Sequence, residues 1–288
     1  MAGMPPGLLE LCVSDNGSDD GTQAVIAGFA ADGLSVRCTR LDENAGFSAN
    51  FWSAARLASG KFVWITGDDD AFDGPGMNRL LTCLEKFDGD LAFINNAPWK
   101  ASAKSLADKP VNGLEGYFED LGLFHGSFIG NTVYRTASLL ATPDTGRTMA
   151  SAYPHMSPVL HLLQTGRCGF FNLKTVRIDD SSRSWRVRQP LLTAVDMARL
   201  VTDLAFTRTR CRLITRLGIY ARLMRSLPRA IHRAGTLAIA IDPANPYQSL
   251  SLGNIIHCYR ASHIAWPVAC LAALGSRCWS LLGRGKSG

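Results

Sequence analysis

Three consecutive carboxylates, Asp68, Asp69 and Asp70, follow the short apolar run Phe-Val-Trp-Ile at residues 62–65. β-Branched and aromatic residues between two glycines predict a buried strand, which would deliver these carboxylates to one edge of a sheet. Adjacent like charges repel one another unless a cation lies among them. Hard oxygen ligands suit Mg²⁺, Mn²⁺ or Ca²⁺, and Asp68 and Asp70 would point the same way if extended geometry continues. The alternative is an acidic turn in solvent.

The segments around this run alternate between predicted strands and predicted helices. We expect strands at residues 8–13, 34–40, 62–65 and 91–94, and helices at 23–29, 48–58 and 77–87. Thr22 or Asp20 is the expected cap of the first helix. The alternation predicts an α/β sheet with substantial parallel pairing, in which ligands bind at the carboxyl ends of the strands. Asp15 and the three aspartates both follow strands, so we expect them at that edge.

Charge divides the 288 residues into two regions of opposite sign. Residues 1–182 carry 14 Lys and Arg against 21 Asp and Glu, whereas residues 183–288 carry 16 against 3. Such asymmetry is expected when one part handles a metal-bound ligand and the other contacts a polyanion. The eight cysteines include no CxxC pair, which argues against a zinc site or a disulfide framework and fits a reducing compartment. No basic segment followed by an apolar one opens the chain, so we expect no secretory signal.

Four ordered sequence blocks carry a family resemblance. They are Val-Ser-Asp-Asn-Gly-Ser-x-Asp-Gly-Thr at 13–22, Asn-x-Gly-x-x-x-Asn-Phe at 44–51, Ala-x-Gly-Lys-Phe-Val-Trp at 58–64 and Gly-Asp-Asp-Asp at 67–70. Together they resemble family 2 glycosyltransferases with the GT-A fold, over about residues 8 to 180. Trp64 and the Asn-Phe pair resemble the corresponding residues of abequosyltransferase-like enzymes of bacterial O-antigen assembly. The resemblance implies a mixed sheet flanked by helices in residues 1–182.

The resemblance also implies which residues bind a nucleotide-sugar donor. Asp15 matches the aspartate that hydrogen-bonds the nucleotide base, and Asn16 stands beside it. Asn44 and Asn50 either shape the nucleotide pocket or are ordinary loop and helix-surface amides. Arg183 either contacts the diphosphate or is a solvated arginine.

Asp68 and Asp70 match the DxD pair of the same family. The resemblance implies that a divalent cation, Mn²⁺ or Mg²⁺, bridges these carboxylates and the donor diphosphate. The leaving nucleoside diphosphate gains negative charge as the glycosidic bond breaks, and a cation stabilises that charge. Asp68 is thus expected to bind both the metal and the donor.

His155 falls where family members place a catalytic acidic residue, twelve positions or so before a glycine, here Gly166, that ends a leucine-rich helix expected at 157–165. An inverting transfer needs a base for the acceptor hydroxyl, and histidine can serve because its ordinary pKa lies near neutrality. The alternatives are that His155 binds the acceptor or that it is a structural residue capping the following helix. Weaker candidates for the base are His125, Asp179 and Asp180.

A further expectation concerns the start of the chain. Relatives begin with a strand and a helix ahead of the strand expected at 8–13, and these have no counterpart here. We expect either a misassigned start codon, with further in-frame residues upstream encoding that strand, or a remnant of a longer enzyme.

Residues 183–288 are predicted to be helical and basic. Apolar residues at helical spacing accompany arginines between Arg208 and Arg233, a pattern suited to an anionic membrane surface. The alternative is a helical cap packed on the catalytic domain. The uncharged run between Arg260 and Arg277 has 16 residues, fewer than the roughly 20 that a spanning helix needs. No nucleic-acid-binding motif is recognisable.

The sequence therefore predicts a metal-dependent, inverting glycosyltransferase that is cytoplasmic and peripheral to the inner face of the cell membrane. Its partners would be a nucleotide-sugar donor and a lipid-linked or polysaccharide acceptor. A catalytically inactive relative that binds nucleotide sugar, or scaffolds a polysaccharide assembly complex, is the alternative. A sugar-nucleotide pyrophosphorylase is disfavoured because no glycine-rich phosphate loop with a nearby basic residue is visible.

Overall fold

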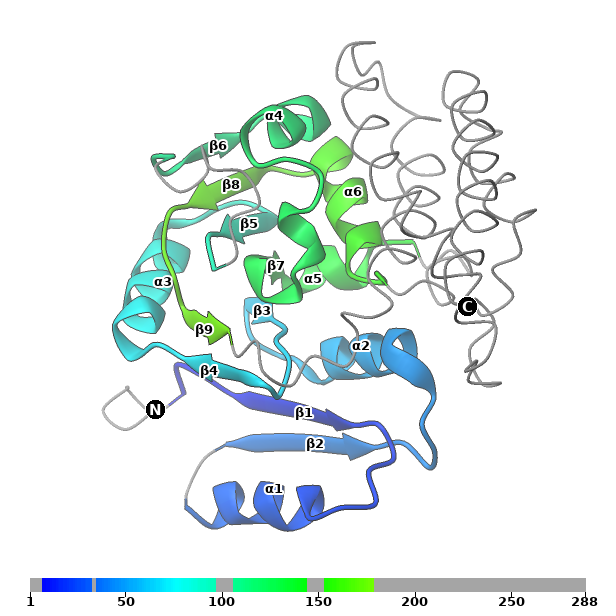
Figure 1. Ribbon diagram of the computed structural model, residues 1–288. Helices are drawn as coiled ribbons and strands as arrows, with labels where there is room; N and C mark the ends of the chain where they lie inside the picture. Colours follow the sequence, from blue (N-terminus) through cyan, green and yellow to red (C-terminus); the bar gives the residue numbers. More distant parts are fainter. Residues whose placement is uncertain (1–6, 33–34, 97–105, 144–152, 179–288) are drawn as a thin grey trace, which may run out of the picture. The chain divides into compact units, whose positions relative to one another are not determined.

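The computed structural model describes residues 7–32, 35–96, 106–143 and 153–178 (Figure 1). The basic region at 183–288 lies outside the described residues, and so do Arg183, Asp179 and Asp180. Among the helices of the described segments, none has the length and apolar character needed to cross a membrane.

Strands and helices alternate over residues 11–64, as the sequence predicts, whereas later in the described chain some strands follow strands and one helix follows another. The strands are β1 (Leu11–Asp15), β2 (Val36–Arg40), β3 (Phe62–Trp64), β4 (Asp70–Phe72), β5 (Leu91–Ile94), β6 (Lys109–Val111), β7 (Thr132–Arg135), β8 (Cys168–Phe171) and β9 (Val176–Ile178). The α-helices are α1 (Thr22–Ala31), α2 (Gly46–Leu57), α3 (Gly74–Lys86), α4 (Gly113–Asp120), α5 (Thr136–Leu140) and α6 (Met156–Thr165). Two 3₁₀ turns, η2 (His125–Ser127) and η3 (Ile129–Asn131), precede β7.

The described strands form three hydrogen-bonded groups. The largest is a mixed sheet in the order β3-β7-β5-β8-β6, in which β5 and β8 run parallel and the other neighbours are antiparallel. β1 pairs in parallel with β2, and β4 pairs antiparallel with β9, as Figure 1 shows. Because β3 and β5 are each antiparallel to β7, they share a direction with β8. The segments after β3, β5 and β8 therefore leave the sheet at one edge, where ligands bind in α/β folds.

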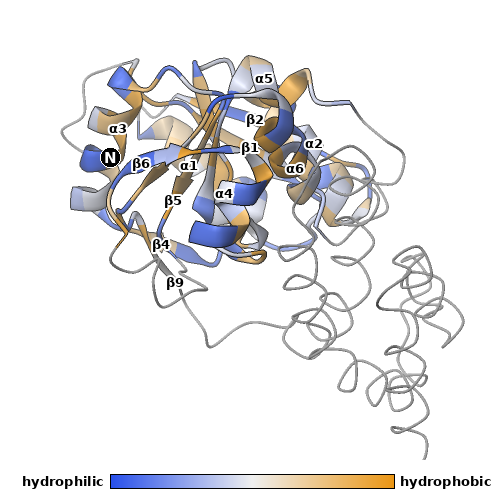
Figure 2. Cartoon of the chain, turned by 90° about the horizontal axis from the view of Figure 1, so that it is seen from above, coloured by the Kyte–Doolittle hydropathy of each residue, from blue (hydrophilic) through white to orange (hydrophobic). Residues whose placement is uncertain are grey.

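β5 is the centre of the core. All four of its side chains are buried, which is why its sequence is a continuous apolar run. Ala92 and Ile94 pack with Leu80 and Leu84 of α3 on one face, while Phe93 stacks on the Tyr117 ring at 5.0 Å on the other. Figure 2 shows β5 in orange, while α3 carries both orange and blue residues.

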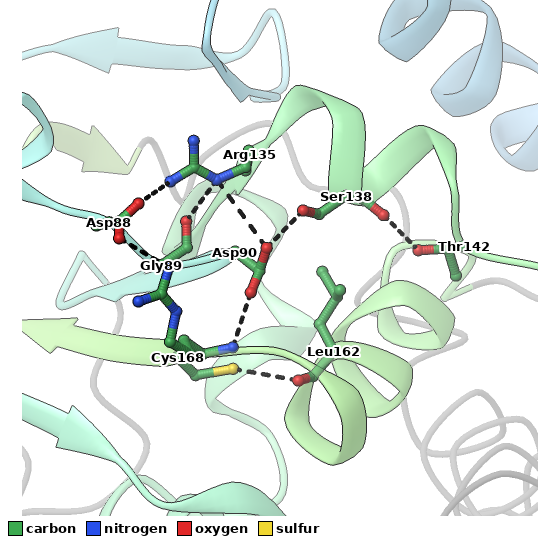
Figure 3. Close-up of polar contacts among 9 residues, drawn as sticks. Asp88, Gly89, Asp90, Arg135, Ser138, Thr142, Leu162 and Cys168 are labelled. Atoms are coloured by element: carbon green, nitrogen blue, oxygen red, sulfur yellow. Dashed lines mark hydrogen bonds and ion pairs between the residues drawn. The ribbon is translucent and has the colours of Figure 1, made fainter.

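Asp90 fixes the amino end of β5 (Figure 3). Its carboxylate accepts hydrogen bonds from the Ser138 hydroxyl at 2.6 Å and the Arg167 N–H at 2.8 Å, and Arg135 Nε lies 4.0 Å away. Asp88 bridges the same two arginines. Partial burial alone would raise the pKa of Asp90, but these hydrogen bonds and the two arginines hold it below its ordinary value. Ion pairs thus stabilise the edge of the sheet where β5 begins, which is opposite the edge where β3, β5 and β8 end.

Two local expectations are wrong. The strand before the acidic triplet ends at Trp64, so Asp68 and Asp69 form a turn and Asp70 opens β4. Asp68 and Asp70 therefore do not alternate along one strand, because pairing with β9 starts a new strand at Asp70. Likewise, α1 has Gly21 as its N-cap without a side-chain cap, although the Asp20 carboxylate accepts the Thr22 N–H at 2.9 Å.

Candidate functional site

Asp15 is the last residue of β1 and is almost fully buried, at 3 % exposure. Its carboxylate accepts hydrogen bonds from the Ser18 N–H at 2.8 Å and from the Gln23 side-chain amide, and Arg40 Nε lies 3.5 Å away. Hydrogen bonds from the Ser18 hydroxyl and N–H, together with Gln23 and Arg40, hold the pKa of Asp15 below its ordinary value. Asp15 is therefore an ionised carboxylate held in one position at neutral pH.

The loop after β1 is clamped to the start of α2 by two asparagines. Asn16 Nδ2 donates to Asn44 Oδ1 at 2.8 Å, and Asn16 Oδ1 accepts the Ala45 N–H at 3.0 Å. Asn44 Oδ1 also accepts the Gly46 N–H at 3.0 Å. Asn44 is thus joined to the neighbouring residues Asp15 and Asn16, 28 positions before it in sequence, in one group of polar residues.

Helix α2 connects this polar group to His155. Phe47 and Phe51 of α2 have ring centroids 6.0 Å and 6.3 Å from the His155 ring. Asn50 lies between them in sequence and is half-buried, and its Oδ1 is buried with no hydrogen-bond partner among the residues described. This differs from an ordinary surface amide, because buried polar atoms are usually hydrogen-bonded.

His155 itself is buried, at 2 % exposure, immediately before α6. Its Nε2 lies 2.9 Å from the Ser127 carbonyl oxygen, and because a carbonyl only accepts, Nε2 carries the proton and Nδ1 the lone pair. Burial lowers the pKa of His155 to about 4, which keeps the ring neutral at physiological pH. His155 is the N-cap residue of α6, as the structural alternative expects, but its side chain makes no capping hydrogen bond.

His125 lies inside the core. It is fully buried, with Nε2 2.9 Å from the Ile94 carbonyl oxygen and the Phe93 and Phe170 rings around it. These contacts are those of a packing residue.

The acidic turn lies beyond the carboxyl end of β3. Asp68 and Asp69 are exposed and Asp70 is half-buried. Asp68 takes part in no hydrogen bond or ion pair within the described segments. Those segments contain no group of three His, Cys, Asp or Glu side chains that could hold a metal ion. Two hard carboxylates nevertheless fit Mg²⁺ or Mn²⁺, which proteins commonly hold with one or two carboxylates while substrate phosphates and water complete the shell.

Sequence reasoning missed the polar residues after β5. Asn95 and Asn96 are both buried, at 2 % and 6 % exposure, and they follow the carboxyl end of the central strand. The signal was present, because polar residues directly after an apolar strand were already used to identify Asp15. Arg40 and Gln23, which hold Asp15, carried no such signal.

Comparison with known proteins identifies similar sequences and similar folds. Residues 2–139 match the family model for glycosyl transferase family 2. The abequosyltransferase RfbV of Salmonella typhimurium is 35 % identical over 78 residues, which are 27 % of this chain and 23 % of that protein. The chain thus aligns with less than a quarter of that curated relative's length.

Solved structures of TarS from S. aureus share the fold. TarS 1–349 in complex with UDP-GlcNAc has a TM-score of 0.59 at 15 % identity, covering 95 % of this chain and 82 % of that one. The complex with UDP has the same TM-score at 16 % identity, covering 95 % and 81 %. At such identities the likeness concerns the fold, and the family match concerns the sequence. The chain is thus similar to glycosyl transferase family 2 over residues 2–139.

Proposed function

We propose that this protein is a glycosyltransferase that transfers a sugar from a nucleotide-sugar donor to a hydroxyl of a lipid-linked or polysaccharide acceptor, with inversion. The observation that carries the proposal is the ionised, fixed Asp15 carboxylate clamped beside Asn16 and Asn44 in a family 2 domain. The solved TarS complexes with UDP-GlcNAc and UDP support a nucleotide-sugar donor. The relative named abequosyltransferase supports transfer of a sugar.

Asp15 is proposed to recognise the nucleotide base. Its carboxylate, charged at neutral pH, is an acceptor for a base N–H, and a hydrogen bond to a charged acceptor is among the stronger kinds. Asn16 and Asn44 hold the surrounding loop, and Asn50 Oδ1 offers a second acceptor. Arg183, outside the described residues, is proposed to contact the diphosphate.

Asp68 and Asp70 are proposed to hold Mn²⁺ or Mg²⁺ together with the donor diphosphate. The bound cation would stabilise the negative charge that develops on the leaving nucleoside diphosphate. The exposed Asp68 carboxylate and the half-buried Asp70 carboxylate supply hard oxygen ligands for it.

His155 is proposed to take the proton from the acceptor hydroxyl. Its Nε2–H is committed to the Ser127 carbonyl, which leaves the lone pair of neutral Nδ1 as the acceptor. A pKa of about 4 makes it a weak base, so it depends on close placement of the hydroxyl. His155→Gln keeps a polar side chain but removes this base, and we expect kcat to fall far more than donor affinity. An unchanged kcat would assign His155 to acceptor binding or to structure.

A second candidate function is nucleotide-sugar binding without catalysis, as a scaffold in polysaccharide assembly. The burial and weak basicity of His155 favour it. Transfer of sugar to any hydroxyl acceptor by the purified chain would rule out this second function.

Peripheral association with the inner face of the cell membrane is a further part of the proposal. Its support is the excess of arginine and lysine in residues 183–288, which suits an anionic lipid surface. Sedimentation with vesicles containing anionic lipid, and not with neutral vesicles, is the expected result.

The first experiment is a calorimetric titration of UDP, CDP, GDP and dTDP into the chain, with and without Mn²⁺. Metal-dependent binding of one nucleotide, lost in Asp15→Asn, supports the proposal. Asp70→Ala should then abolish transfer and leave the circular dichroism spectrum intact, with the exposed neighbour Asp69→Ala as the matched control. Failure of all four nucleotides to bind would overturn the proposed function.

A further inference from the structure

The side-chain amide of Asn96 joins three segments at the carboxyl end of the sheet. It is 6 % exposed and uses both its donors and its acceptor oxygen. Nδ2 donates to the Gly130 carbonyl at 2.7 Å and to Thr175 Oγ1 at 3.0 Å, while Oδ1 accepts the Thr175 N–H at 2.6 Å and the Val176 N–H at 3.0 Å. Only an amide supplies two donors and an acceptor at this spot, so aspartate and leucine are both poor substitutes.

The residues that Asn96 binds begin β9. Val176 is the first residue of β9, and its partner across the ladder is Phe72 of β4. The same register pairs Ile178 with Asp70, and the Asp73 N–H donates to the Thr175 carbonyl at 2.8 Å just beyond the ladder. The place where β9 begins therefore sets the place of Asp70. Figure 1 shows the two short strands side by side.

Gly130 links the same amide to β3. Its carbonyl oxygen accepts both the Asn96 amide and the Trp64 indole N–H, the latter at 3.1 Å. The Trp64 ring lies against Phe72 of β4, with ring centroids 5.5 Å apart. The acidic turn runs from Trp64 to β4, so both of its ends are anchored on groups that Asn96 contacts.

We propose that Asn96 is a positioning residue for the acidic turn: by fixing the start of β9 it fixes the register of β4 and the place of the Asp70 carboxylate. The inference deepens the role proposed above for Asp68 and Asp70 and rests on that role for its functional meaning. In this proposal Asn96 is not itself a ligand of the metal or the donor. Its effect reaches Asp70 through backbone hydrogen bonds.

The test uses Asn96→Asp in the full chain, which keeps the shape and the acceptor side but loses both amide donors. Asn95→Asp is the matched control, because Asn95 is equally buried but its amide pairs with Asn172 instead of β9. Hydrogen exchange is followed at the amides of residues 70–73. We expect exchange there to be at least about tenfold faster in Asn96→Asp, with β5 and β7 unchanged, and near wild type in Asn95→Asp.

The second readout is the affinity for Mn²⁺ in the presence of UDP, measured from free Mn²⁺ by electron paramagnetic resonance. Removal of groups that orient metal ligands typically costs about 10–100-fold in affinity, and we expect a loss in that range for Asn96→Asp alone. Equal exchange at residues 70–73 in the two variants would overturn the inference. So would an Mn²⁺ affinity of Asn96→Asp equal to that of the wild type, provided that the wild type binds Mn²⁺. No Mn²⁺ binding by the wild type would overturn the proposed function, while hydrogen exchange still decides the positioning role.

Thr175 supplies a second pair of variants should Asn96→Asp fail to fold. Thr175→Val removes the hydroxyl that accepts from Asn96 and keeps the side-chain shape, whereas Thr175→Ser keeps the hydroxyl. Faster exchange at residues 70–73 and weaker Mn²⁺ binding in the valine variant, with recovery of both in the serine variant, are expected. Equal behaviour of the two would refute the inference.

Discussion

Gly17, in the loop that holds Asp15, gives the sharpest prediction from the structure. Its φ is +77°, and an added Cβ would lie 2.7 Å from the carbonyl carbon of Glu43 and 2.9 Å from its Cα. The left-handed conformation costs an L-residue about 1–2 kcal/mol, and overpacking against backbone about 1–3 kcal/mol more. Gly17→Ala should therefore lower the free energy of unfolding by about 2–5 kcal/mol.

Gly28→Ala is the matched control in the same part of the chain. Gly28 lies inside α1, with nothing within 4 Å of an added Cβ and no positive φ. Alanine there should stabilise the protein by about 0.5–1 kcal/mol, because glycine is a poor residue for a helix interior. Since both substitutions change the unfolded chain alike, the difference between them reports the folded state.

Urea unfolding of both variants measures the two free energies, and calorimetry measures nucleotide binding. Gly17→Ala should also weaken nucleotide binding, because relief of the clash moves Glu43 and with it the Asn16–Asn44 contact. Gly28→Ala should bind as the wild type does. A Gly17→Ala protein as stable as Gly28→Ala would refute the reasoning. Normal nucleotide binding by a destabilised Gly17→Ala would mean that this loop is not part of the nucleotide site.

Three other predictions follow from the same structure. Because the folded pKa of Asp90 is lowered, its contribution to stability is present above the unfolded pKa of about 3.9 and is lost as pH falls through the folded pKa. Asp90→Asn should therefore lower the free energy of unfolding, measured with urea, by about 1–3 kcal/mol at pH 7 and by progressively less below pH 4. His155 is buried neutral, so its contribution is present above pH 6.5 and lost as pH falls towards about 4; the acid-side slope should be shallower in His155→Gln, and equal slopes would contradict it. Trp64→Phe removes the hydrogen bond to Gly130 and should cost about 0.5–1.5 kcal/mol, measured by thermal unfolding.

The sequence predicted those strands and helices whose own amino-acid composition determines their secondary structure. β5 has the expected bounds, Leu91–Ile94, because a short continuous apolar run is typical of a strand buried on both faces. The helices expected at 23–29, 48–58 and 77–87 correspond to α1, α2 and α3 with ends shifted by a few residues. Helix ends depend on caps, and α1 and α2 have no side-chain cap that the sequence could have revealed.

The short strands lay beyond sequence reasoning because tertiary pairing makes them. β4 contains a charged residue, Asp70, in only three residues, and it is a strand because β9 lies alongside it. β6 contains Pro110, which usually argues against a strand. It is tolerated because, among the described strands, β6 is the edge of the five-stranded sheet and pairs with β8 alone.

The described carboxylates differ in function through the donors around them, and no sequence pattern distinguishes those surroundings. Asp90 accepts from the Ser138 hydroxyl and the Arg167 N–H and faces two arginines, so its charge is compensated within the fold. Asp15 is compensated as well, but partly by the Gln23 amide, a neutral donor that a nucleotide base N–H can replace without stranding a charge. Asp68 has neither hydrogen bond nor ion pair among the described residues, and its charge stands beside those of Asp69 and Asp70. Repulsion between neighbouring carboxylates is weakened by solvent or by a bound cation, so the proposed metal dependence is best tested at Asp68 and Asp70.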